Sequence, residues 1–275
     1  MSGTLYIVAT PIGNLDDLAP RARQTLAEVD LIAAEDTRHS GRLLSHIGAK
    51  PRLIALHDHN EKQLVGKLIV ELESGKSVAL ISDAGTPLLS DPGYRLVAAA
   101  HEHDIAVSPI PGPSAITAAL SAAGLPTDRF CFEGFLPAKE KARHDVLEAL
   151  RSEHRTIVFF ESVHRIEAAL ADMATVLGNN RAAFVGRELT KLHEQCLHGT
   201  LGELCNAVRD GAIVQKGEFV IVVAGADKDG ESPMDVDRLL LALNAHLSAK
   251  DAAAVAARAT GEKKNALYKR LLELK

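Results

Sequence analysis

The feature that most constrains the fold of this chain is a rhythm of short, continuously apolar segments that alternate with helical ones. Thr4–Ala9 is apolar and β-branched without polar alternation, and it ends before Pro11 and Gly13. Continuous apolarity is typical of a strand covered on both faces, as in a parallel sheet. The rhythm recurs at Leu31–Ala34, Leu53–Leu56, Val78–Ile81 and Ile105–Val107. Helical segments lie near residues 20–29, 40–47, 61–73 and 93–103, so the sequence predicts a doubly wound α/β domain over residues 1–122.

A second series of strands and helices follows Gly124. Strands are expected at 130–132, 156–160, 182–185, 195–198 and 219–223, and helices near 139–151, 164–176 and 200–209. This pattern predicts a second α/β domain over residues 123–226.

The last part of the chain is different in composition. Residues 225–232 are polar and contain glycine, which is typical of a linker. An apolar-periodic helix is expected over 236–247, followed by an alanine-rich segment, 249–274, with a turn at Gly261. We expect a helical domain over residues 233–275. It resembles a helix-turn-helix, although many small helical pairs without a nucleic-acid role share this pattern.

Composition excludes several classes of protein. The chain is 47% hydrophobic and 24% charged, which is typical of a globular protein and not of a disordered, collagen-like or coiled-coil one. No run of about 18 apolar residues occurs, and the first residues lead directly into a strand, so we expect a cytoplasmic protein with no membrane partner. The three cysteines form no C-x-x-C pair, and we expect no metal site.

Charge is distributed unevenly. Residues 258–275 contain six basic and two acidic side chains, a net +4, which leaves −9 for the rest of a chain whose total is −5. Such asymmetry is expected when the body binds a neutral or cationic small molecule and the tail contacts phosphates. A basic helix with a solvated face has the same composition, so charge alone leaves both interpretations open.

Unusual residues concentrate after the expected strands of the first domain. The segments are Thr10–Asp17, Glu35–Arg38, Ser82–Pro87 and Pro111–Ser114. Ligands of open α/β sheets bind at the carboxyl ends of the strands, so we expect these loops to form one site. The phosphate-binding patterns G-x-G-x-x-G and G-x-x-x-x-G-K-[ST] are absent there. The loops offer backbone groups, hydroxyls and carboxylates, which suit an adenosine-containing ligand with a positive charge.

Five motifs carry a resemblance to a known family. They are Ala9–Leu15, Ala34–Arg38, Ser82–Pro87 with Ser90–Gly93, Phe160–Arg165 and Gly186–Lys191. In order and spacing the chain resembles the ribosomal RNA small subunit methyltransferase I family, the rRNA-modifying branch of the tetrapyrrole methylases. The resemblance covers residues 4–225, and the tail resembles the family's C-terminal helical domain. Val163 departs from the pattern, where proline is expected, as does Phe160, where tyrosine is frequent.

The resemblance implies S-adenosylmethionine-dependent methylation of a ribose 2′-hydroxyl on a cytidine of 16S rRNA, in the decoding centre of the small ribosomal subunit. It also implies a homodimer whose two α/β domains enclose the cofactor. Carried over by position, the cofactor contacts of the first domain are Pro11, Gly13, Ser82, Asp83, Ala84, Gly85, Leu88, Ser114 and Ala115. Those of the second domain are Glu161, Ser162, Arg187, Ala224 and Gly225. For RNA we expect contacts from Arg165, Lys263, Lys264, Lys269 and Arg270.

Methyl transfer to a hydroxyl requires an aligned acceptor and a group that removes its proton. Asp36 is the first candidate for this general base, and Arg38 is expected to hold a substrate phosphate by a forked contact. An ion pair between these two side chains is the alternative interpretation. Glu188 is a second candidate base, for which an ion pair with Arg187 is the favoured explanation. Asp83 either accepts from the cofactor or caps a turn.

Three functions remain open at this point. The first is methylation of rRNA, the second is methylation of a small tetrapyrrole on the same fold, and the third is RNA binding without catalysis. Glu35–Arg38, Glu161–Arg165 and the basic tail favour the first.

Overall fold

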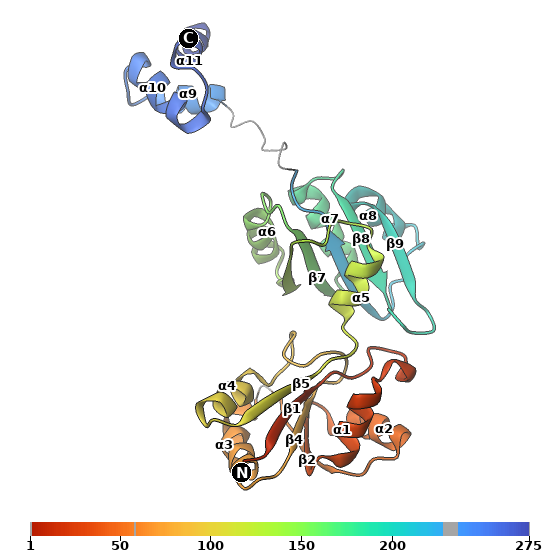
Figure 1. Cartoon of the computed structure of the whole chain (residues 1–275). Coiled ribbons are helices and arrows are strands. Elements are labelled where there is room, and N and C mark those ends of the chain that lie inside the picture. The colour runs from red at the N-terminus through yellow and green to blue at the C-terminus, as the bar shows by residue number, and fades with distance from the viewer. Residues whose placement is uncertain (1, 58, 228–235, 275) are drawn as a thin grey trace. The chain divides into compact units, whose positions relative to one another are not determined.

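The apolar segments of the N-terminal half pair into a sheet with the strand order β3-β2-β4-β1-β5 (Figure 1). The structure is a computed structural model that describes residues 2–57, 59–227 and 236–274. All strand pairs of this sheet are parallel, as the continuous apolarity predicted. The strands are β1 (Thr4–Val8), β2 (Leu31–Ala34), β3 (Arg52–Ala55), β4 (Val78–Ile81) and β5 (Ala106–Ile110).

Helices cover both faces of this sheet, which explains why its strands lack polar alternation. Successive side chains of β2 point to opposite faces. Leu31 and Ala33 pack with α3 and α4, whereas Ile32 and Ala34 pack with α1 and α2. The predicted doubly wound arrangement is therefore confirmed. The helices are α1 (Pro20–Glu28), α2 (Thr37–Ile47), α3 (Glu61–Glu73) and α4 (Tyr94–Glu102).

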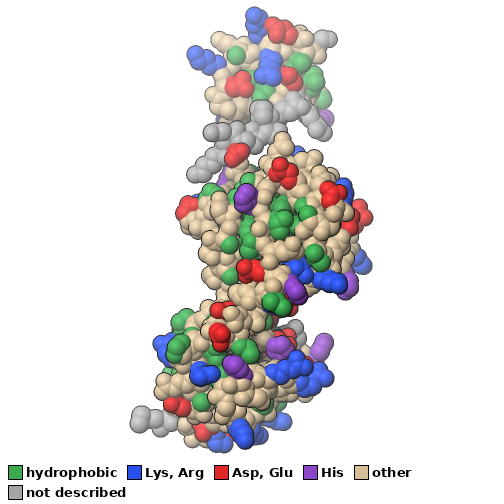
Figure 2. Space-filling model, turned by 90° about the vertical axis from the view of Figure 1, so that its right-hand side faces the viewer, with side chains coloured by type: hydrophobic (Ala, Val, Ile, Leu, Met, Phe, Trp, Pro, Cys, Tyr) green, Lys and Arg blue, Asp and Glu red, His purple; other side chains and the backbone are tan. Residues whose placement is uncertain are grey.

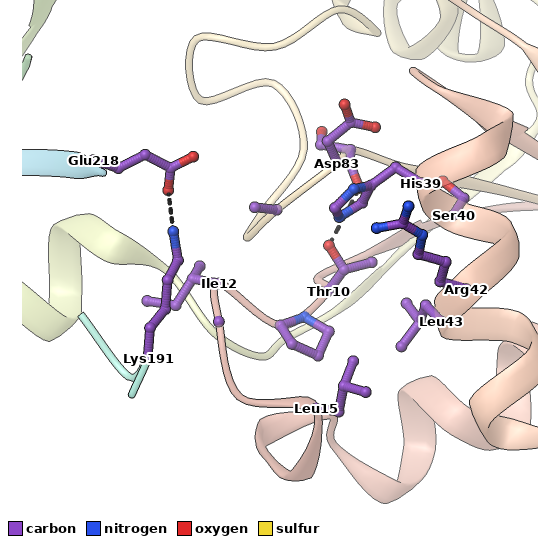
Figure 3. A pocket seen from close by; sticks show the side chains of 14 residues that line it. Thr10, Ile12, Leu15, His39, Ser40, Arg42, Leu43, Asp83, Lys191 and Glu218 are labelled. Carbon is purple, nitrogen blue, oxygen red and sulfur yellow. Dashed lines mark hydrogen bonds and ion pairs between the residues drawn. The ribbon is translucent and has the colours of Figure 1, made fainter. Parts of the chain in front are cut away.

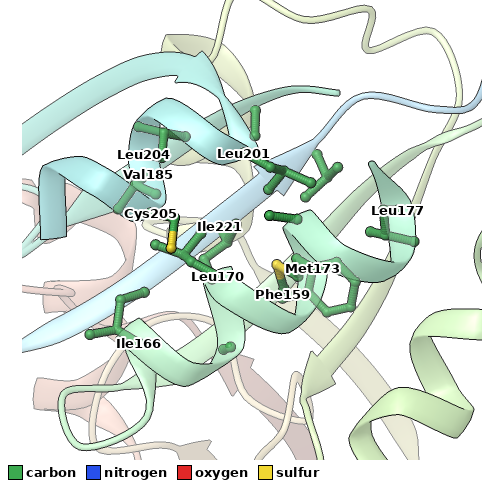
Figure 4. Packing of buried hydrophobic residues seen from close by; sticks show 14 of the residues in the cluster. Phe159, Ile166, Leu170, Met173, Leu177, Val185, Leu201, Leu204, Cys205 and Ile221 are labelled. Carbon is green, nitrogen blue, oxygen red and sulfur yellow. The ribbon is translucent and has the colours of Figure 1, made fainter. Parts of the chain in front are cut away.

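A second sheet follows, with the order β6-β7-β10-β8-β9. It is mixed, because β6 and β7 are parallel while β10 runs antiparallel to both β7 and β8, and β9 runs antiparallel to β8. One face packs against α6, α7 and α8 around buried Phe159, Leu170 and Ile221 (Figure 4). The elements are β6 (Phe130–Phe135), α6 (Glu140–Ala149), β7 (Thr156–Ser162), α7 (Ile166–Leu177), β8 (Ala182–Arg187), β9 (Gln195–Thr200), α8 (Leu201–Arg209) and β10 (Glu218–Val223).

Helix α5 (Ala115–Ala122) covers the other face of this second sheet. Its Ile116, Ala119 and Leu120 belong to the same buried cluster as Phe184 and Val220 of β8 and β10. The domain boundary expected after residue 122 therefore lies on the C-terminal side of α5, even though α5 packs on the second sheet. Residues 1–151 and 155–224 form one compact unit, and the division into domains at 1–122, 123–226 and 233–275 stays a prediction.

Residues 152–154 and 225–275 form a separate compact unit. Its described helices are α9 (Val236–Asn244), α10 (Ala249–Thr260) and α11 (Lys264–Glu273). Gly261 ends α10 in the left-handed conformation with φ 75°, as the predicted turn requires. The expected linker, 225–232, lies largely outside the described residues. Among the residues that the structure describes, no helix is long and apolar enough to cross a membrane.

Candidate functional site

The loops after β1, β2, β4 and β5 are joined by hydrogen bonds at one edge of the first sheet. Thr10 and Gly85 exchange two backbone hydrogen bonds, of 2.9 and 3.1 Å. The Thr10 hydroxyl donates to the Ser82 carbonyl oxygen at 3.2 Å. The backbone N–H of Asp36 donates to Asp83 Oδ1 at 3.0 Å. The Thr86 hydroxyl donates to a carbonyl oxygen of the loop after β5 at 3.1 Å. The predicted convergence of these loops is confirmed.

One cavity at this edge has a volume of about 310 Å³, and we call it the Ser40 cavity. Figure 3 shows His39 and Arg42 of α2 on one side of it and Lys191 with Glu218 on the other. Its lining residues are Thr10, Pro11, Ile12, Gly13, Leu15, His39, Ser40, Arg42, Leu43, Ser82, Asp83, Ala84, Lys191 and Glu218.

A second cavity, of about 360 Å³, shares Ile12, Ala84 and Glu218 with the first, and we call it the Glu161 cavity. Its other lining residues are Gly85, Thr86, Leu89, Ser90, Asp91, Ser114, Ala115, Phe135, Phe160, Ser162, Val163, Gly217, Phe219 and Val220, together with Glu161. Its volume lies in the range of about 300–1,000 Å³ that is common for small-molecule sites.

The Ser40 cavity contains two unused polar groups. The hydroxyl oxygens of Ser40 and Ser82 are buried and have no hydrogen-bond partner among the described residues. Each of these residues is only 2% exposed. A buried hydroxyl without a partner costs about 1–3 kcal/mol, so both groups are candidates to hydrogen-bond to a ligand.

The loop between β8 and β9 brings a lysine to the wall shared by the two cavities. Lys191 Nζ lies 2.7 Å from Glu188 Oε1 and 2.9 Å from Glu218 Oε2. Burial acts to lower the pKa of Lys191, but the hydrogen bonds to both carboxylates outweigh it and raise this pKa. Burial acts to raise the pKa of Glu188, and the bonds from Lys191 and from the Glu218 N–H lower it below its usual value.

Gly13 allows the loop after β1 to reach this lysine. A Cβ atom at Gly13 would overlap Lys191 Cγ and lie 3.1 Å from the Leu189 carbonyl oxygen. The neighbouring Asn14 N–H donates to the Thr190 hydroxyl at 3.3 Å. The close approach of these two loops therefore requires glycine.

Comparison with known proteins identifies the family. The family model described as Tetrapyrrole (Corrin/Porphyrin) Methylases matches residues 4–205, and that of the RsmI C-terminal HTH domain matches residues 230–275. The ribosomal RNA small subunit methyltransferase I of Escherichia coli O157:H7 is 53% identical over 272 residues, 98% of this chain and 95% of that protein. The protein of the same name from Pseudomonas aeruginosa is 51% identical over 275 residues, 99% of this chain and 98% of that one. The chain belongs to the ribosomal RNA small subunit methyltransferase I family.

Solved structures agree on the fold of this family member. A uroporphyrin-III-C-methyltransferase from Thermus thermophilus aligns with a TM-score of 0.58 at 18% identity, over 81% of this chain and 94% of that one. A further structure of the Thermus enzyme, complexed with S-adenyl homocysteine, aligns with a TM-score of 0.56 at 16% identity, over 81% of this chain and 97% of that one.

The Glu161 cavity has the donor and acceptor groups that S-adenosylmethionine requires. Ser114 occupies the N-cap of α5 without a side-chain capping bond, which leaves its hydroxyl and the first N–H groups of the helix for a carboxylate. Phe160 packs edge-on against Phe132 and Phe135, with ring centroids 4.8 and 5.7 Å apart, and presents an apolar wall to an adenine ring. The carboxylate of Glu161, in a residue that is 3% exposed, adds a hydrogen-bond acceptor whose charge is balanced by Arg165 at 2.8 Å. These residues fit the cofactor.

The expected cofactor residues divide according to the cavity that they line. Pro11, Gly13, Ser82 and Asp83 line the Ser40 cavity, Ala84 lines both cavities, and Gly85, Ser114, Ala115, Glu161 and Ser162 line the Glu161 cavity. Leu88, Arg187 and Ala224 line neither of the two.

Those last three positions have structural roles in the first compact unit. Leu88 packs against the core of the first sheet. Arg187 donates to the carbonyl oxygens of Lys216 and His193 at 2.6 and 2.8 Å, so its guanidinium ties loops together. Ala224 follows the carboxyl end of β10, roughly 20 Å along the strand from the residue that pairs with Ser162. The expectation that these three residues contact the cofactor therefore stays a prediction, which neither cavity supports. Gly225 belongs to the other compact unit.

Asp36 forms the ion pair with Arg38 that was the alternative to its role as general base. Its carboxylate accepts from the N–H and side chain of Arg38, with Oδ2 2.8 Å from Nη2, and it caps α2. The side-chain and backbone hydrogen bonds from Arg38 hold the pKa of Asp36 far below its usual value. Such a carboxylate is a weak base, and Asp36 does not line either cavity. For Glu188 the ion-pair partner is Lys191, not the expected Arg187.

The expected RNA-binding residues have different surroundings. Arg165 Nη2 lies 2.8 Å from Glu161 Oε1, and its other nitrogens donate to Ser162 Oγ and to a carbonyl oxygen. These contacts fix the turn at Glu161 and Ser162, which lines the Glu161 cavity. Arg270 pairs with Asp237 at 2.6 Å and joins α11 to α9. Lys263, Lys264 and Lys269 are exposed, with Lys269 4.0 Å from Glu273.

Sequence reasoning did not find His39, Ser40 and Arg42. The predicted helix began at residue 40, whereas α2 begins at Thr37 behind the Asp36 cap, so its first turn was read as loop. A helix that starts at 37 places residues 39, 42 and 43 on one face, which was the available signal. Among the described residues, no three His, Cys, Asp or Glu side chains are grouped as metal ligands.

Proposed function

We propose that this chain transfers the methyl group of S-adenosylmethionine to the ribose 2′-hydroxyl of a cytidine in 16S rRNA. The observation that carries this is the pair of cavities with a common wall, in a chain more than half identical, along nearly its whole length, to a ribosomal RNA small subunit methyltransferase I. One cavity suits the methyl donor, and the other suits the acceptor.

When bound, S-adenosylmethionine would supply a methyl carbon on a positively charged sulfur, so that an O–C bond forms in line as the S–C bond breaks and neutral S-adenosylhomocysteine leaves. The chain's task is to hold that line. Ser114 and the N-terminus of α5 would bind the carboxylate end, and Phe160 would cover the adenine. Glu161, whose charge Arg165 already balances, would offer its carboxylate as a hydrogen-bond acceptor. Arg165 and Ser162 fix Glu161 in place.

The acceptor hydroxyl must lose its proton as the new bond forms. Asp83 lines the Ser40 cavity, and its Oδ1 accepts from the Asp36 N–H. Among the described residues none donates to its Oδ2, so this oxygen is our candidate to receive the proton. Asp83→Asn keeps the shape and removes the basic oxygen. We expect turnover to fall by about 100-fold or more while cofactor affinity is kept, and unchanged turnover excludes this role.

The function is tested by supplying labelled methyl donor to the purified chain with small ribosomal subunits that lack the modification. We expect label in 2′-O-methylcytidine after nuclease digestion, and none in a tetrapyrrole precursor offered in parallel. Label in the tetrapyrrole, or in neither substrate, overturns the proposal. Calorimetry with S-adenosylmethionine separates a non-catalytic RNA-binding protein, which releases no heat.

The basic tail is part of the proposal as a phosphate-binding surface. Lys263 and Lys264 stand at the start of α11, where they are exposed and form no ion pair with another described residue. Truncation after Gly230 is expected to weaken RNA binding and to flatten its dependence on salt. Unchanged binding contradicts this role for the tail.

We include a homodimer in the proposal because the family resemblance implies one, and a cytoplasmic location because the expected substrate is the ribosome. Light scattering on the purified chain measures its mass directly, and a monomer at working concentration contradicts the dimer.

A further inference from the structure

The Ser40 cavity is lined by two cationic side chains, Arg42 and Lys191, whereas no Lys or Arg lines the Glu161 cavity. The groups that fit the cofactor lie in the Glu161 cavity, whereas Ser40, Arg42 and His39 reach only the Ser40 cavity. We propose that the Ser40 cavity binds the acceptor nucleotide of the RNA, with Ser40 and Ser82 hydrogen-bonding to its sugar or base and Arg42 pairing with its phosphate. This inference rests on the proposed function and names the residues that recognise its substrate.

Position is the first argument. In-line transfer requires the acceptor oxygen to lie next to the methyl donor. The two cavities share Ile12, Ala84 and Glu218, so a ligand in one meets a ligand in the other across this wall. Glu218 is held there by Lys191 at 2.9 Å.

The unused hydroxyls are the second argument. Ser40 Oγ and Ser82 Oγ come from α2 and from the loop after β4, and both are buried without a partner among the described residues. A hydroxyl donates and accepts, which matches the sugar hydroxyls and the base edge of a nucleotide. Because the two hydroxyls come from separate elements and line one cavity, the conformation of a single loop does not explain them both.

Charge is the third argument. Arg42 is exposed on α2 and makes no ion pair with any side chain in the described part of the chain. His39 stands one turn before it on the same helix, on the same side of the cavity (Figure 3). Figure 2 shows Lys, Arg and His side chains gathered along one side of the first α/β domain and the adjoining edge of the second. A guanidinium without a carboxylate partner at such a surface suits a phosphodiester.

The apolar part of the lining completes the match. Leu15, Leu43 and Pro11 offer a flat, non-polar surface to the face of a base. A cavity of about 310 Å³ admits one nucleotide, so the target nucleotide enters alone, out of its stack.

The test uses two variants of the full chain and two matched controls. Arg42→Gln removes the free cation, with Arg23→Gln on α1 as control, since Arg23 is exposed and lines neither cavity. Ser40→Ala removes one unused hydroxyl, with Ser45→Ala as control, because Ser45 lies on the same helix and is exposed. The readouts are kcat/KM on small ribosomal subunits, cofactor Kd by calorimetry, melting temperature, and binding of a short cytidine-containing RNA across a salt series.

We expect Arg42→Gln to lower kcat/KM by about tenfold or more and to reduce the salt slope of RNA binding by about 0.7, the value for one phosphate contact of a single strand. Ser40→Ala is expected to lower kcat/KM without lowering the melting temperature, because no partner is lost in the free protein. If the role of Ser40 were purely structural, Ser40→Ala would instead lower the melting temperature and leave kcat/KM unchanged. Cofactor Kd stays within about twofold in both variants, and the controls behave as wild type.

Two results overturn the inference. One is wild-type kcat/KM and salt slope in Arg42→Gln. The other is a loss of cofactor affinity that matches the loss of kcat/KM, which assigns the cavity to the cofactor. If the wild-type chain methylates no small-subunit RNA, the proposed function fails by itself. The salt slope of RNA binding then still decides the role of Arg42.

Discussion

Replacing Arg165 by methionine separates a structural role from an RNA-binding one. The guanidinium pairs with Glu161 at 2.8 Å and donates to Ser162 Oγ at 3.1 Å and to the Leu136 carbonyl oxygen at 2.9 Å. Methionine keeps much of the length and apolar stem of the side chain but removes all three bonds. The carboxylate of Glu161, with a side chain that is 2% exposed, then loses its cationic partner.

The magnitude follows from burial. Removing one partner of a fully buried ion pair costs about 3–5 kcal/mol. The Arg165 side chain is 27% exposed, so water reaches the gap and the expected cost falls to about 2–3 kcal/mol. For a chain of this size each kcal/mol corresponds to about 2–4 °C, so the melting temperature is expected to fall by about 4–12 °C.

The assay combines thermal unfolding with two binding measurements. Cofactor affinity should weaken, because Glu161 and Ser162 line the cofactor cavity, while the salt slope of RNA binding stays as in wild type. In the double variant with Glu161→Gln the two losses should not add, since both changes break one interaction. An unchanged melting temperature together with a reduced salt slope refutes the structural role and restores Arg165 as a phosphate contact.

Three further predictions concern the two loops at the shared wall and the α2 cap. Gly13→Ala pushes the loop after β1 against Lys191 and should cost about 1–3 kcal/mol by thermal unfolding, whereas Gly66→Ala, in open space on α3, should not destabilise. Asp36→Asn keeps a good helix cap and should retain turnover within about threefold, whereas a tenfold loss restores Asp36 as the base. Lys191→Met should lower stability most between about pH 5 and 10. Because the pKa of Glu188 is lowered, the loss of stability in Lys191→Met should shrink at acidic pH, where Glu188 becomes protonated. Because the pKa of Lys191 is raised, the loss should persist until strongly basic pH, where Lys191 loses its proton. A loss of stability that is constant from pH 3 to pH 8 contradicts the ion pair.

The fold of the first sheet was readable because each of its strands is covered on both faces. Val78–Ile81 and Leu31–Ala34 are continuous apolar segments, and the structure begins and ends β4 and β2 at those residues. Helix α5 was not among the predicted helices, and the apolar face of Ile116, Ala119 and Leu120 would have shown that it is buried but not on which sheet it packs. Which surface a helix covers depends on contacts between distant segments, and periodicity does not contain them.

The location of the site could be predicted where the direction of the strands could be predicted. All strands of the first sheet are parallel, so the loops after them meet at one edge, as predicted, and Ser82, Asp83 and Gly85 line the cavities there. Their expected contacts with the cofactor stay predictions. In the second sheet β10 runs antiparallel to β7, which reverses the rule. The residues at the start of β10, Glu218 to Val220, therefore line the Glu161 cavity, while Ala224 at its end lies far from it. A motif carried over by position shows that a residue lies at the end of a strand, but it does not show whether that end faces the ligand. The direction in which the strand pairs with its neighbours decides this.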